Sequence, residues 1–255
     1  MTNLPTTPSF RLDGKKALVT GGGRGIGLAA ATALAEAGAI PLLAARTEAE
    51  VYAASEALKA RGLQAGSAVL DVTDRKAVEQ LVDNEGPFQV LVNNAGLARH
   101  APFVDATEDE YDSVMEINVK AAFFVAQAVS WGLMSADLPG SIINISSQMG
   151  HVGGPKRTVY CASKHAIEGM TKAMAWELGS YNIRVNTLCP TFIETELTAP
   201  YLKDKEFREF VESKIAFGRV GQVEEIMGSV VFLASDASSL ITGSSLMVDG
   251  GWTAS

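Results

Sequence analysis

A glycine-rich turn between a short apolar stretch and an alanine-rich helix does most to limit what this chain can fold into. Residues Lys15 to Thr20 are typical of a buried strand, and an Ala/Leu-rich helix extends to about Ala37. Glycines between them let the backbone approach a pyrophosphate, and the free N–H groups of the helix favour an anion. A tight connection is the plain alternative. Placement between strand and helix favours a dinucleotide-phosphate site. Its candidate residues are Gly21, Gly23, Arg24, Gly25, Ile26 and Gly27.

Strands and helices alternate along the rest of the chain. Further strands are expected from Gly140 and at 40–45, 65–70, 88–92, 183–188 and 245–248, and helices at 48–60, 75–84, 108–133, 156–178 and 223–234. This alternation predicts an α/β fold, a single doubly wound Rossmann-type domain whose parallel sheet carries helices on both faces. Because Pro41 forfeits a ladder hydrogen bond, we expect it to mark the start of its strand.

Length and composition favour one domain. The chain has 255 residues, of which 47% are hydrophobic, so it can bury a large core. We expect residues 1–11 to form a flexible N-terminal arm and residues 12–255 a single domain. Aromatic and charged residues at about 191–217 follow a helical pattern at the end of the sixth strand. This segment is predicted to be a mobile lid over substrate, with a plain surface helix as the alternative.

Charge and cysteine content argue against several function classes. The net charge of −8, without an extended basic cluster, disfavours a nucleic-acid partner. The two cysteines, Cys161 and Cys189, have neither C-x-x-C spacing nor an accompanying histidine cluster, so no disulfide framework and no metal site is predicted. No cationic start precedes an apolar run, and no stretch approaches about 18 uncharged apolar residues. We therefore expect a cytoplasmic protein without a membrane partner.

The end of the second strand indicates which dinucleotide binds. It is followed by Arg46, and no acidic residue occurs until Glu48. A carboxylate would repel a ribose 2′-phosphate, whereas Arg46 can pair with it in bidentate fashion and Arg24 can add a second cation. NADP(H) is therefore the predicted cofactor. The alternative is NAD(H), with two solvated arginines beside the loop.

Asp71 and Val72 close the third strand, where they can contact the adenine of a dinucleotide. A carboxylate at this place can accept a hydrogen bond from the adenine amino group. Equally, this stretch can simply begin the next helix, with Thr73 or Asp74 as its cap.

Tyr160 and Lys164 lie four residues apart in an expected helix, so they share one face and their polar tips can reach a common point. An ammonium held about 4 to 6 Å away favours the phenolate and brings the tyrosine pKa toward working pH. The pair therefore predicts proton transfer. Taken alone, a packed tyrosine beside a solvated lysine is the plainer interpretation.

Other polar residues stand near strand ends. Asn118, in an apolar helical segment, is costly to bury unless it is paired, and pairing is compatible with a catalytic role. Ser146 and Ser147 follow the fifth strand, where parallel sheets place ligand contacts, with turn formation as the alternative. Polar and basic residues nearby favour a hydroxylated or anionic small-molecule substrate. The candidate contacts are Gln148, His151, Arg157 and Phe192, with Arg99, His100, Lys156 and Thr191 as further pocket residues.

From about Lys15 to Trp252 the chain resembles the short-chain dehydrogenase/reductase family. The motifs that carry the resemblance are Thr20-Gly21-x-x-x-Gly25-x-Gly27, Asn93-Asn94-Ala95-Gly96, Asn118, Ser147, Tyr160-x-x-x-Lys164 and Asp249-Gly250-Gly251. The family's catalytic serine usually precedes its tyrosine by thirteen residues, which selects Ser147 because 160 − 147 = 13.

The resemblance implies a role for each motif residue. Tyr160 would be the general acid/base, and Ser147 would hydrogen-bond the substrate oxygen. Lys164 would lower the tyrosine pKa and hold the nicotinamide ribose. Asn118 would bind a water that continues the proton path. The implied cofactor contacts beyond the glycine turn are Asn94, Ala95, Gly96, Tyr160, Lys164, Pro190, Thr191, Ile193 and Thr195.

The implied activity is hydride transfer between NADP(H) and a small secondary alcohol or ketone of the sugar, polyol, sugar acid or 3-oxoacyl type. A seven-stranded sheet and a homotetramer are implied with it. Pro190-Thr191 departs from the family's usual Pro-Gly, so we expect Thr191 to shape the substrate pocket while Ile193 and Thr195 preserve cofactor binding. A catalytically inactive cofactor-binding sensor or scaffold of the same fold is the alternative.

Overall fold

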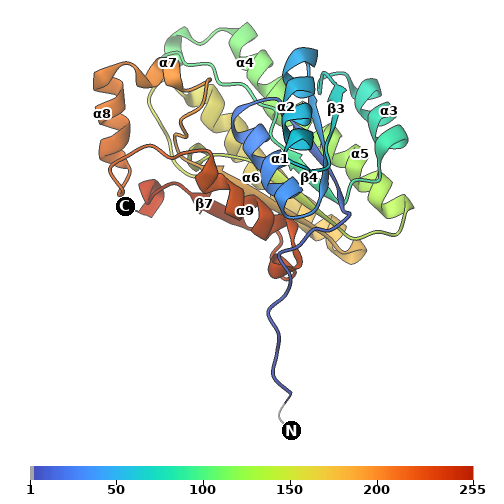
Figure 1. Ribbon diagram of the computed structural model, residues 1–255. Coiled ribbons are helices and arrows are strands. Elements are labelled where there is room, and N and C mark those ends of the chain that lie inside the picture. Colours follow the sequence, from blue (N-terminus) through green and yellow to red (C-terminus); the bar gives the residue numbers. More distant parts are fainter. Residues whose placement is uncertain (1–2, 255) are drawn as a thin grey trace.

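The computed structural model describes residues 3–254 (Figure 1). The strands are β1 (Lys16–Thr20), β2 (Ile40–Ala45), β3 (Gly66–Val69), β4 (Val90–Asn93), β5 (Gly140–Ile145), β6 (Ile183–Pro190) and β7 (Ser245–Val248). The α-helices are α1 (Gly25–Glu36), α2 (Glu48–Ala60), α3 (Arg75–Glu85), α4 (Glu108–Met115), α5 (Ala122–Ser135), α6 (Thr158–Leu178), α7 (Ala199–Leu202), α8 (Lys205–Lys214) and α9 (Glu224–Ala234).

The seven strands form one parallel sheet in the order β3-β2-β1-β4-β5-β6-β7. The chain builds the sheet outward from β1 through β2 to β3, then crosses back so that β4 pairs with the other side of β1. A crevice at the carboxyl ends of the strands is expected where the order reverses in this way. The predicted Rossmann-type fold with helices on both faces is confirmed.

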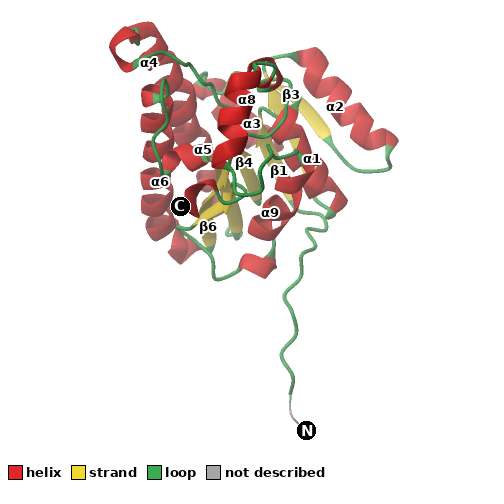
Figure 2. Ribbon diagram, turned by 90° about the vertical axis from the view of Figure 1, so that its left-hand side faces the viewer, coloured by secondary structure: helices red, strands yellow, loops and turns green. Residues whose placement is uncertain are grey.

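Two apolar clusters cover the two faces of the sheet. Along β1, Val19 belongs to the cluster shared with α1, α2 and α9, whereas Leu18 belongs to the cluster shared with α3, α5 and α6. Alternation of this kind follows from the two-residue period of a strand. Figure 2 shows the two helical layers on opposite sides of the strands. The sheet is therefore buried on both faces, as its nearly continuous apolar strands predict.

Several predicted boundaries are wrong by one or two residues. The helix carrying the Tyr160 pair begins at Thr158 and not at Lys156, because Lys156 has a φ of 58° and Arg157 has a non-helical ψ of 18°. The fourth strand begins at Val90 and not at Phe88, and the sixth continues past Leu188 to Pro190. Pro41 lies where expected, one residue before β2 begins to pair with β3.

The predicted helix at 108–133 is interrupted. A π-helical turn spans Glu116–Ala121 between α4 and α5, and it contains Asn118. Such turns insert an extra residue per turn and are frequent at functional sites. By length and composition the combined stretch Glu108–Ser135 could cross a bilayer, yet half of its most apolar window is buried in the fold. Val125, Val129 and Leu133 pack against the sheet, so the stretch also satisfies the pattern of a core helix.

The N-terminal arm and the segment after β6 lie at opposite ends of the strands (Figure 1). Residues 3–11 are exposed and without regular secondary structure, and Leu12 is the first buried residue. The flexibility of this arm stays a prediction, and Met1, Thr2 and Ser255 lie outside the described residues. After β6 the chain forms α7 and α8, which pack on a small apolar cluster of their own around Val211 and Ile215. Whether they move as a lid also stays a prediction.

Candidate active site at the carboxyl ends of the strands

The glycine turn brings the start of α1 against the end of β1. Gly21 and Gly25 have φ values of 64° and 54°, in the left-handed region that favours glycine. At Gly27 a Cβ atom would lie 2.1 Å from the carbonyl oxygen of Gly21, so only glycine allows this approach. No described side chain caps α1, which leaves the first-turn N–H groups to bind an anion.

Thr20 and Asn94 join the ends of β1 and β4. The Thr20 hydroxyl accepts hydrogen bonds from the backbone N–H groups of Asn94 and Ala95, at 2.9 and 3.0 Å. In return, Nδ2 of Asn94 donates to the carbonyl oxygens of Thr20 and Gly21, at 2.9 and 3.2 Å. These bonds join the ends of the two strands at the point where the strand order reverses, and Gly96 follows in close contact with the Asn118 side chain.

Both predicted phosphate-binding arginines are exposed beside this turn. Arg24 lies 3.9 Å from a Glu50 oxygen and 3.7 Å from a Glu196 oxygen, contacts too long and too exposed to hold it strongly. The Arg46 charge helps to lower the pKa of Asp71, so these two residues lie near each other. The two guanidinium groups are therefore available to an anion at the end of β2.

Asp71 is engaged within its own turn. Its carboxylate accepts from the N–H and the hydroxyl of Thr73, at 3.0 and 2.7 Å, and these bonds lower its pKa. Asp74 caps α3 by accepting from two backbone N–H groups, as the alternative interpretation expected. Asp71 and Val72 still stand at the edge of the crevice beside β3, and their contact with adenine stays a prediction.

The loop after β6 closes the other side of the crevice. A Cβ atom on Gly25 would lie 3.5 Å from Cγ2 of Thr195, so this loop runs directly beside the glycine turn. Ile193 is buried and forms a single bridge with Gly221. The Thr191 hydroxyl is buried without a hydrogen-bond partner among the described residues. An orphaned hydroxyl, a free helix N-terminus and close-packed glycines would suit a bound dinucleotide.

The departure at Thr191 is compatible with this backbone. Thr191 is not among the described non-glycine residues with positive φ, which are Asp137, Lys156 and Asn182. The chain therefore does not need the conformational freedom of glycine there, and the threonine adds a hydroxyl where a glycine would leave none.

Lys164 is buried below Tyr160. Its Nζ donates to the carbonyl oxygen of Ile145 at 2.7 Å and lies 5.7 Å from the centroid of the Tyr160 ring. Burial lowers the pKa of Lys164 to about 8, and the charges of Cys189 and Glu168 oppose this shift. The ammonium is thus anchored at the end of β5, one helical turn from the phenol, as the spacing predicts.

Tyr160 and Ser147 come together in front of this lysine. Burial raises the pKa of the Tyr160 phenol, and a hydrogen bond with Ser147 and the positive charge of Arg157 oppose the rise. The expected depression of the Tyr160 pKa by Lys164 is therefore not found in this geometry, where desolvation is the larger effect. The Ser147 hydroxyl also donates to Oε1 of Gln148 and accepts from the N–H of Met149, both at 3.1 Å.

The side-chain amide of Asn118 is held by hydrogen bonds behind Tyr160 and Lys164. Its Oδ1 accepts from the N–H of Leu97 at 2.7 Å, and its Nδ2 donates to the Leu97 carbonyl and the Ser163 hydroxyl, at 2.9 and 3.0 Å. The amide is 2% exposed, so these bonds satisfy the pairing that its burial requires. Asn118 thereby ties the π-helical turn to the loop after β4 and to α6.

Arg157 and aromatic rings from the lid segment form one side of the site. The guanidinium lies 5.0 Å from the Phe192 ring centroid and 5.8 Å from that of Phe207. Its Nη1 donates to Nε2 of His100 at 2.6 Å, and burial and the Arg157 charge lower the pKa of His100 to about 4. The imidazole is therefore neutral and can accept. Phe192 also packs on Trp252, at 5.8 Å between centroids.

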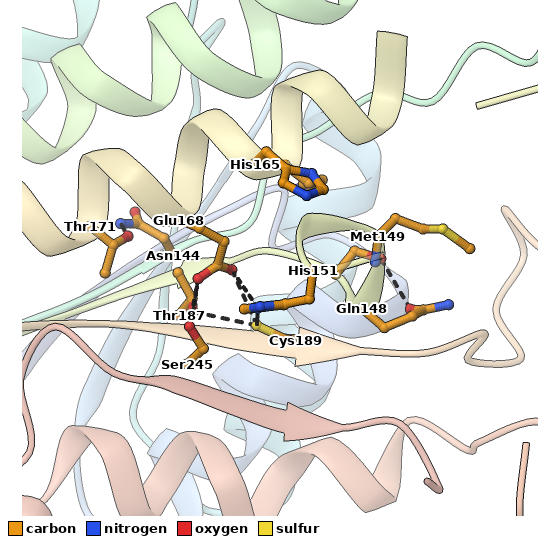
Figure 3. Close-up of polar contacts among 12 residues, drawn as sticks. Asn144, Gln148, Met149, His151, His165, Glu168, Thr171, Thr187, Cys189 and Ser245 are labelled. Atoms are coloured by element: carbon orange, nitrogen blue, oxygen red, sulfur yellow. Dashed lines mark hydrogen bonds and ion pairs between the residues drawn. The ribbon is translucent and has the colours of Figure 1, made fainter. Parts of the chain in front are cut away.

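Of the two remaining substrate candidates, one lies in the predicted site and the other does not. Gln148 is buried beside Ser147, within the predicted site. His151 points elsewhere, toward Glu168 and Cys189, as Figure 3 shows. Sequence reasoning placed Phe207 only within the predicted lid segment and selected neither Trp252 nor Glu168 for any role. No spacing signal marks the latter two, because each reaches its neighbours only through the tertiary fold.

The chain is similar to known enzymes over nearly its whole length. A family model described as enoyl-(acyl carrier protein) reductase matches residues 21–253. Gluconate 5-dehydrogenase of Gluconobacter oxydans is 41% identical over 96% of this chain and 97% of its own. L-xylulose reductase of Bos taurus is 38% identical over 96% and 99%. The structure of a gluconate 5-dehydrogenase from Burkholderia cenocepacia, in complex with NADP and tartrate, has a TM-score of 0.92 with 38% identity over 96% and 98%.

Proposed function

The chain belongs to the short-chain dehydrogenase/reductase family, and we propose that its substrate is a sugar acid. It is an oxidoreductase that transfers a hydride between NADP(H) and a secondary alcohol or ketone. The glycine turn, Arg24, Arg46 and the loop after β6 would hold the cofactor, which would supply or accept that hydride when bound. The protein's residues bind and orient the substrate and move the proton.

In this proposal Tyr160 exchanges a proton with the substrate oxygen. During reduction the Tyr160 hydroxyl gives its proton to the carbonyl oxygen, and during oxidation the phenolate takes the proton of the alcohol. Ser147, which lies beside Tyr160, donates to the same oxygen and stabilises its developing charge. The Lys164 ammonium, anchored on the Ile145 carbonyl, would hold the nicotinamide ribose beside Tyr160. Asn118 fixes the loop after β4 against α6 through its hydrogen bonds to Leu97 and Ser163.

The proposal of a sugar acid as substrate rests on Arg157. It is half-buried, and the groups whose charges favour its protonation are Tyr160, Cys161 and Tyr201, none of which is a carboxylate. A desolvated guanidinium without an acidic partner is costly, whereas a substrate carboxylate would pair with it in bidentate fashion. Phe192, Phe207 and neutral His100 hold the guanidinium in place without neutralising it. The relative solved with NADP holds tartrate, itself a hydroxy acid.

The test is a panel of matched substrates assayed by the absorbance of the reduced nicotinamide. Aldonic acids and their neutral polyol counterparts of equal chain length should differ in kcat/KM in favour of the acids. Arg157→Gln should lower kcat/KM for the acid by about 10- to 100-fold, because a hydrogen bond to a charged group contributes about 1.5 to 3 kcal/mol. Neutral substrates should be affected far less.

Lys156→Gln is the matched control, since Lys156 is the exposed neighbour of the same charge. It should leave the preference for acids intact. An equal loss on acids and polyols in Arg157→Gln would contradict the assignment of a carboxylate. In that case a neutral ketose is the better candidate, as the xylulose-reducing relative suggests. Cofactor binding without turnover on any substrate would favour the sensor or scaffold.

We further propose a cytoplasmic homotetramer. Large apolar side chains are exposed on the outer faces of α5 and α6, notably Trp131 at 62% and Trp176 at 89%. Apolar surface of this kind marks contacts with partners. Light scattering should give the mass of four chains, and Trp176→Glu should shift it to a smaller assembly.

A further inference from the structure

Three side chains with metal-ligating atoms converge behind the active site. His151 follows the 3₁₀ turn after β5, Glu168 lies in the middle of α6, and Cys189 is the penultimate residue of β6 (Figure 3). Glu168 and Cys189 are buried, and the His151 side chain is 28% exposed. The sequence predicts no metal site, because these residues are far apart in the chain and none of the usual spacings joins them.

The three ligating atoms stand at the spacing of a tetrahedral ion. Nε2 of His151 lies 3.4 Å from Oε1 of Glu168 and 3.5 Å from Sγ of Cys189, and Sγ lies 3.3 Å from the same Oε1. Ligand bonds of about 2.0 to 2.3 Å around tetrahedral Zn²⁺ put neighbouring ligand atoms about 3.3 to 3.6 Å apart. The three atoms therefore already form one face of such a tetrahedron.

The carboxylate is oriented by hydrogen bonds on its other oxygen. Oε2 of Glu168 accepts from the hydroxyls of Ser245 and Thr187, at 2.6 and 2.9 Å, which leaves Oε1 facing the imidazole and the thiol. Outer hydrogen bonds of this kind usually fix the ligands of a metal site.

We propose that His151, Glu168 and Cys189 bind a divalent ion of the Zn²⁺ class, with a fourth position open to water. Imidazole, carboxylate and thiolate are the ligands that Zn²⁺ takes, and three protein ligands with an open position are a known arrangement. Partial exposure of His151 provides the access route from solvent. Binding would release the thiol proton and join the 3₁₀ turn Gln148–Gly150 to α6 and β6, the elements that carry or adjoin Ser147, Lys164 and Pro190.

Cobalt binding tests this directly on the full chain, without any substrate. Thiolate ligation of Co²⁺ gives a near-ultraviolet charge-transfer band, and tetrahedral Co²⁺ gives visible bands. We expect one Co²⁺ per chain by equilibrium dialysis, both sets of bands, and their loss when Zn²⁺ is added. The chain has only two cysteines, so Cys161→Ser leaves Cys189 as the sole thiol, and this variant should keep the bands.

Substitutions in the cluster should remove the signal, and a matched histidine should not. Cys189→Ser should abolish the charge-transfer band, and His151→Gln should weaken Co²⁺ binding by about tenfold or more. His165→Gln changes an exposed histidine whose one hydrogen-bond partner among residues 3–254 is the Cys161 carbonyl, so this variant should bind Co²⁺ as the wild type does. Zn²⁺ should raise the unfolding temperature of the wild type and of Cys161→Ser.

Absence of the charge-transfer band from Cys161→Ser would overturn the proposal, even if Cys189→Ser failed to fold. A charge-transfer band that persists in Cys189→Ser would also overturn the proposal, as would the absence of bound cobalt after dialysis. The cluster would then be a closed hydrogen-bonded network in which the Cys189 thiol donates to Glu168. Because every readout concerns the metal, failure here would leave the proposed dehydrogenase function untouched.

Discussion

Replacing Lys164 by methionine should abolish turnover yet leave the protein at least as stable as the wild type near neutral pH. Lys164 is 7% exposed, and burial lowers its pKa from 10.5 to about 8. The charged form is therefore less favourable in the folded protein than in the unfolded chain. Methionine has a similar length, keeps the apolar contacts of the lysine stem and carries no charge to desolvate.

The size of the expected change in the free energy of unfolding follows from the lowered pKa of Lys164. A fall of about 2.5 pKa units corresponds to roughly 3 kcal/mol at about 1.4 kcal/mol per unit. Against this, the Ile145 carbonyl loses its donor, which costs about 1 to 3 kcal/mol. The net gain at neutral pH is then roughly 0 to 2 kcal/mol. The cost at the carbonyl does not depend on pH, so the pH dependence isolates the charge.

The sign of that dependence is fixed by linkage. Between about pH 8 and pH 10.5 the unfolded wild-type chain binds more protons at Lys164 than the folded protein does, so wild-type stability rises with pH. Below about pH 8 the full penalty is present. The stability difference between Lys164→Met and the wild type should therefore shift by roughly 2 kcal/mol in favour of the wild type between about pH 7 and pH 9.5.

Urea unfolding of both proteins at equal chain concentration measures this difference. Lys172→Met, on the exposed face of the same helix, is the control, because water solvates its ammonium in both states. A stability difference that stays constant with pH would refute the reasoning. The reasoning would also be refuted if Lys164→Met were less stable than the wild type by several kcal/mol at neutral pH with an unchanged m-value.

Three further substitutions test the site and the turn. Tyr160→Phe should lower kcat by about 10² to 10⁴ while leaving the cofactor Kd nearly unchanged, and substantial retained turnover would reject Tyr160 as the proton donor. Arg46→Gln should weaken NADP⁺ about tenfold or more and leave NAD⁺ unaffected in fluorescence titrations, whereas equal losses would exclude a 2′-phosphate contact. Gly27→Ala should destabilise by about 1 to 3 kcal/mol in urea, because its Cβ would meet the Gly21 carbonyl, whereas Gly169→Ala, with open space beside it, should stabilise by about 0.5 to 1 kcal/mol.

The parts of the fold that depend on local patterns could be predicted from the sequence. Apolar strands alternating with amphipathic or apolar helices leave few arrangements other than a parallel sheet with helices on both faces. The helix start at Thr158, two residues beyond the expected Lys156, could not be predicted, since Lys156 adopts the left-handed region without being glycine or asparagine. The π-helical turn around Asn118 could not be predicted either. Its extra residue is stabilised by the contacts of Asn118 with Leu97 and Ser163, which are distant in sequence, and not by a local pattern.

The site itself was predictable only where one element carries several of its residues. Tyr160 and Lys164 share α6, so helical spacing alone places them together. Arg157 could be named as a candidate, but its pairing with Phe192, Phe207 and His100 depends on how the lid segment packs. Contacts between separate elements are set by the tertiary fold, which a single sequence does not encode in any local pattern.

The cluster of His151, Glu168 and Cys189 shows how a small error in the predicted end of a strand prevents a site from being recognised in the sequence. Ending the sixth strand at Leu188 leaves the direction of Cys189 undetermined, whereas the strand in fact continues to Pro190. Side chains alternate along a strand, so Leu188 enters the cluster on the α1 and α9 face while Thr187 and Cys189 point to the opposite face. There both meet Glu168 of α6, one turn beyond Lys164. Two further residues of strand therefore decide whether a buried thiol faces the apolar core or a carboxylate.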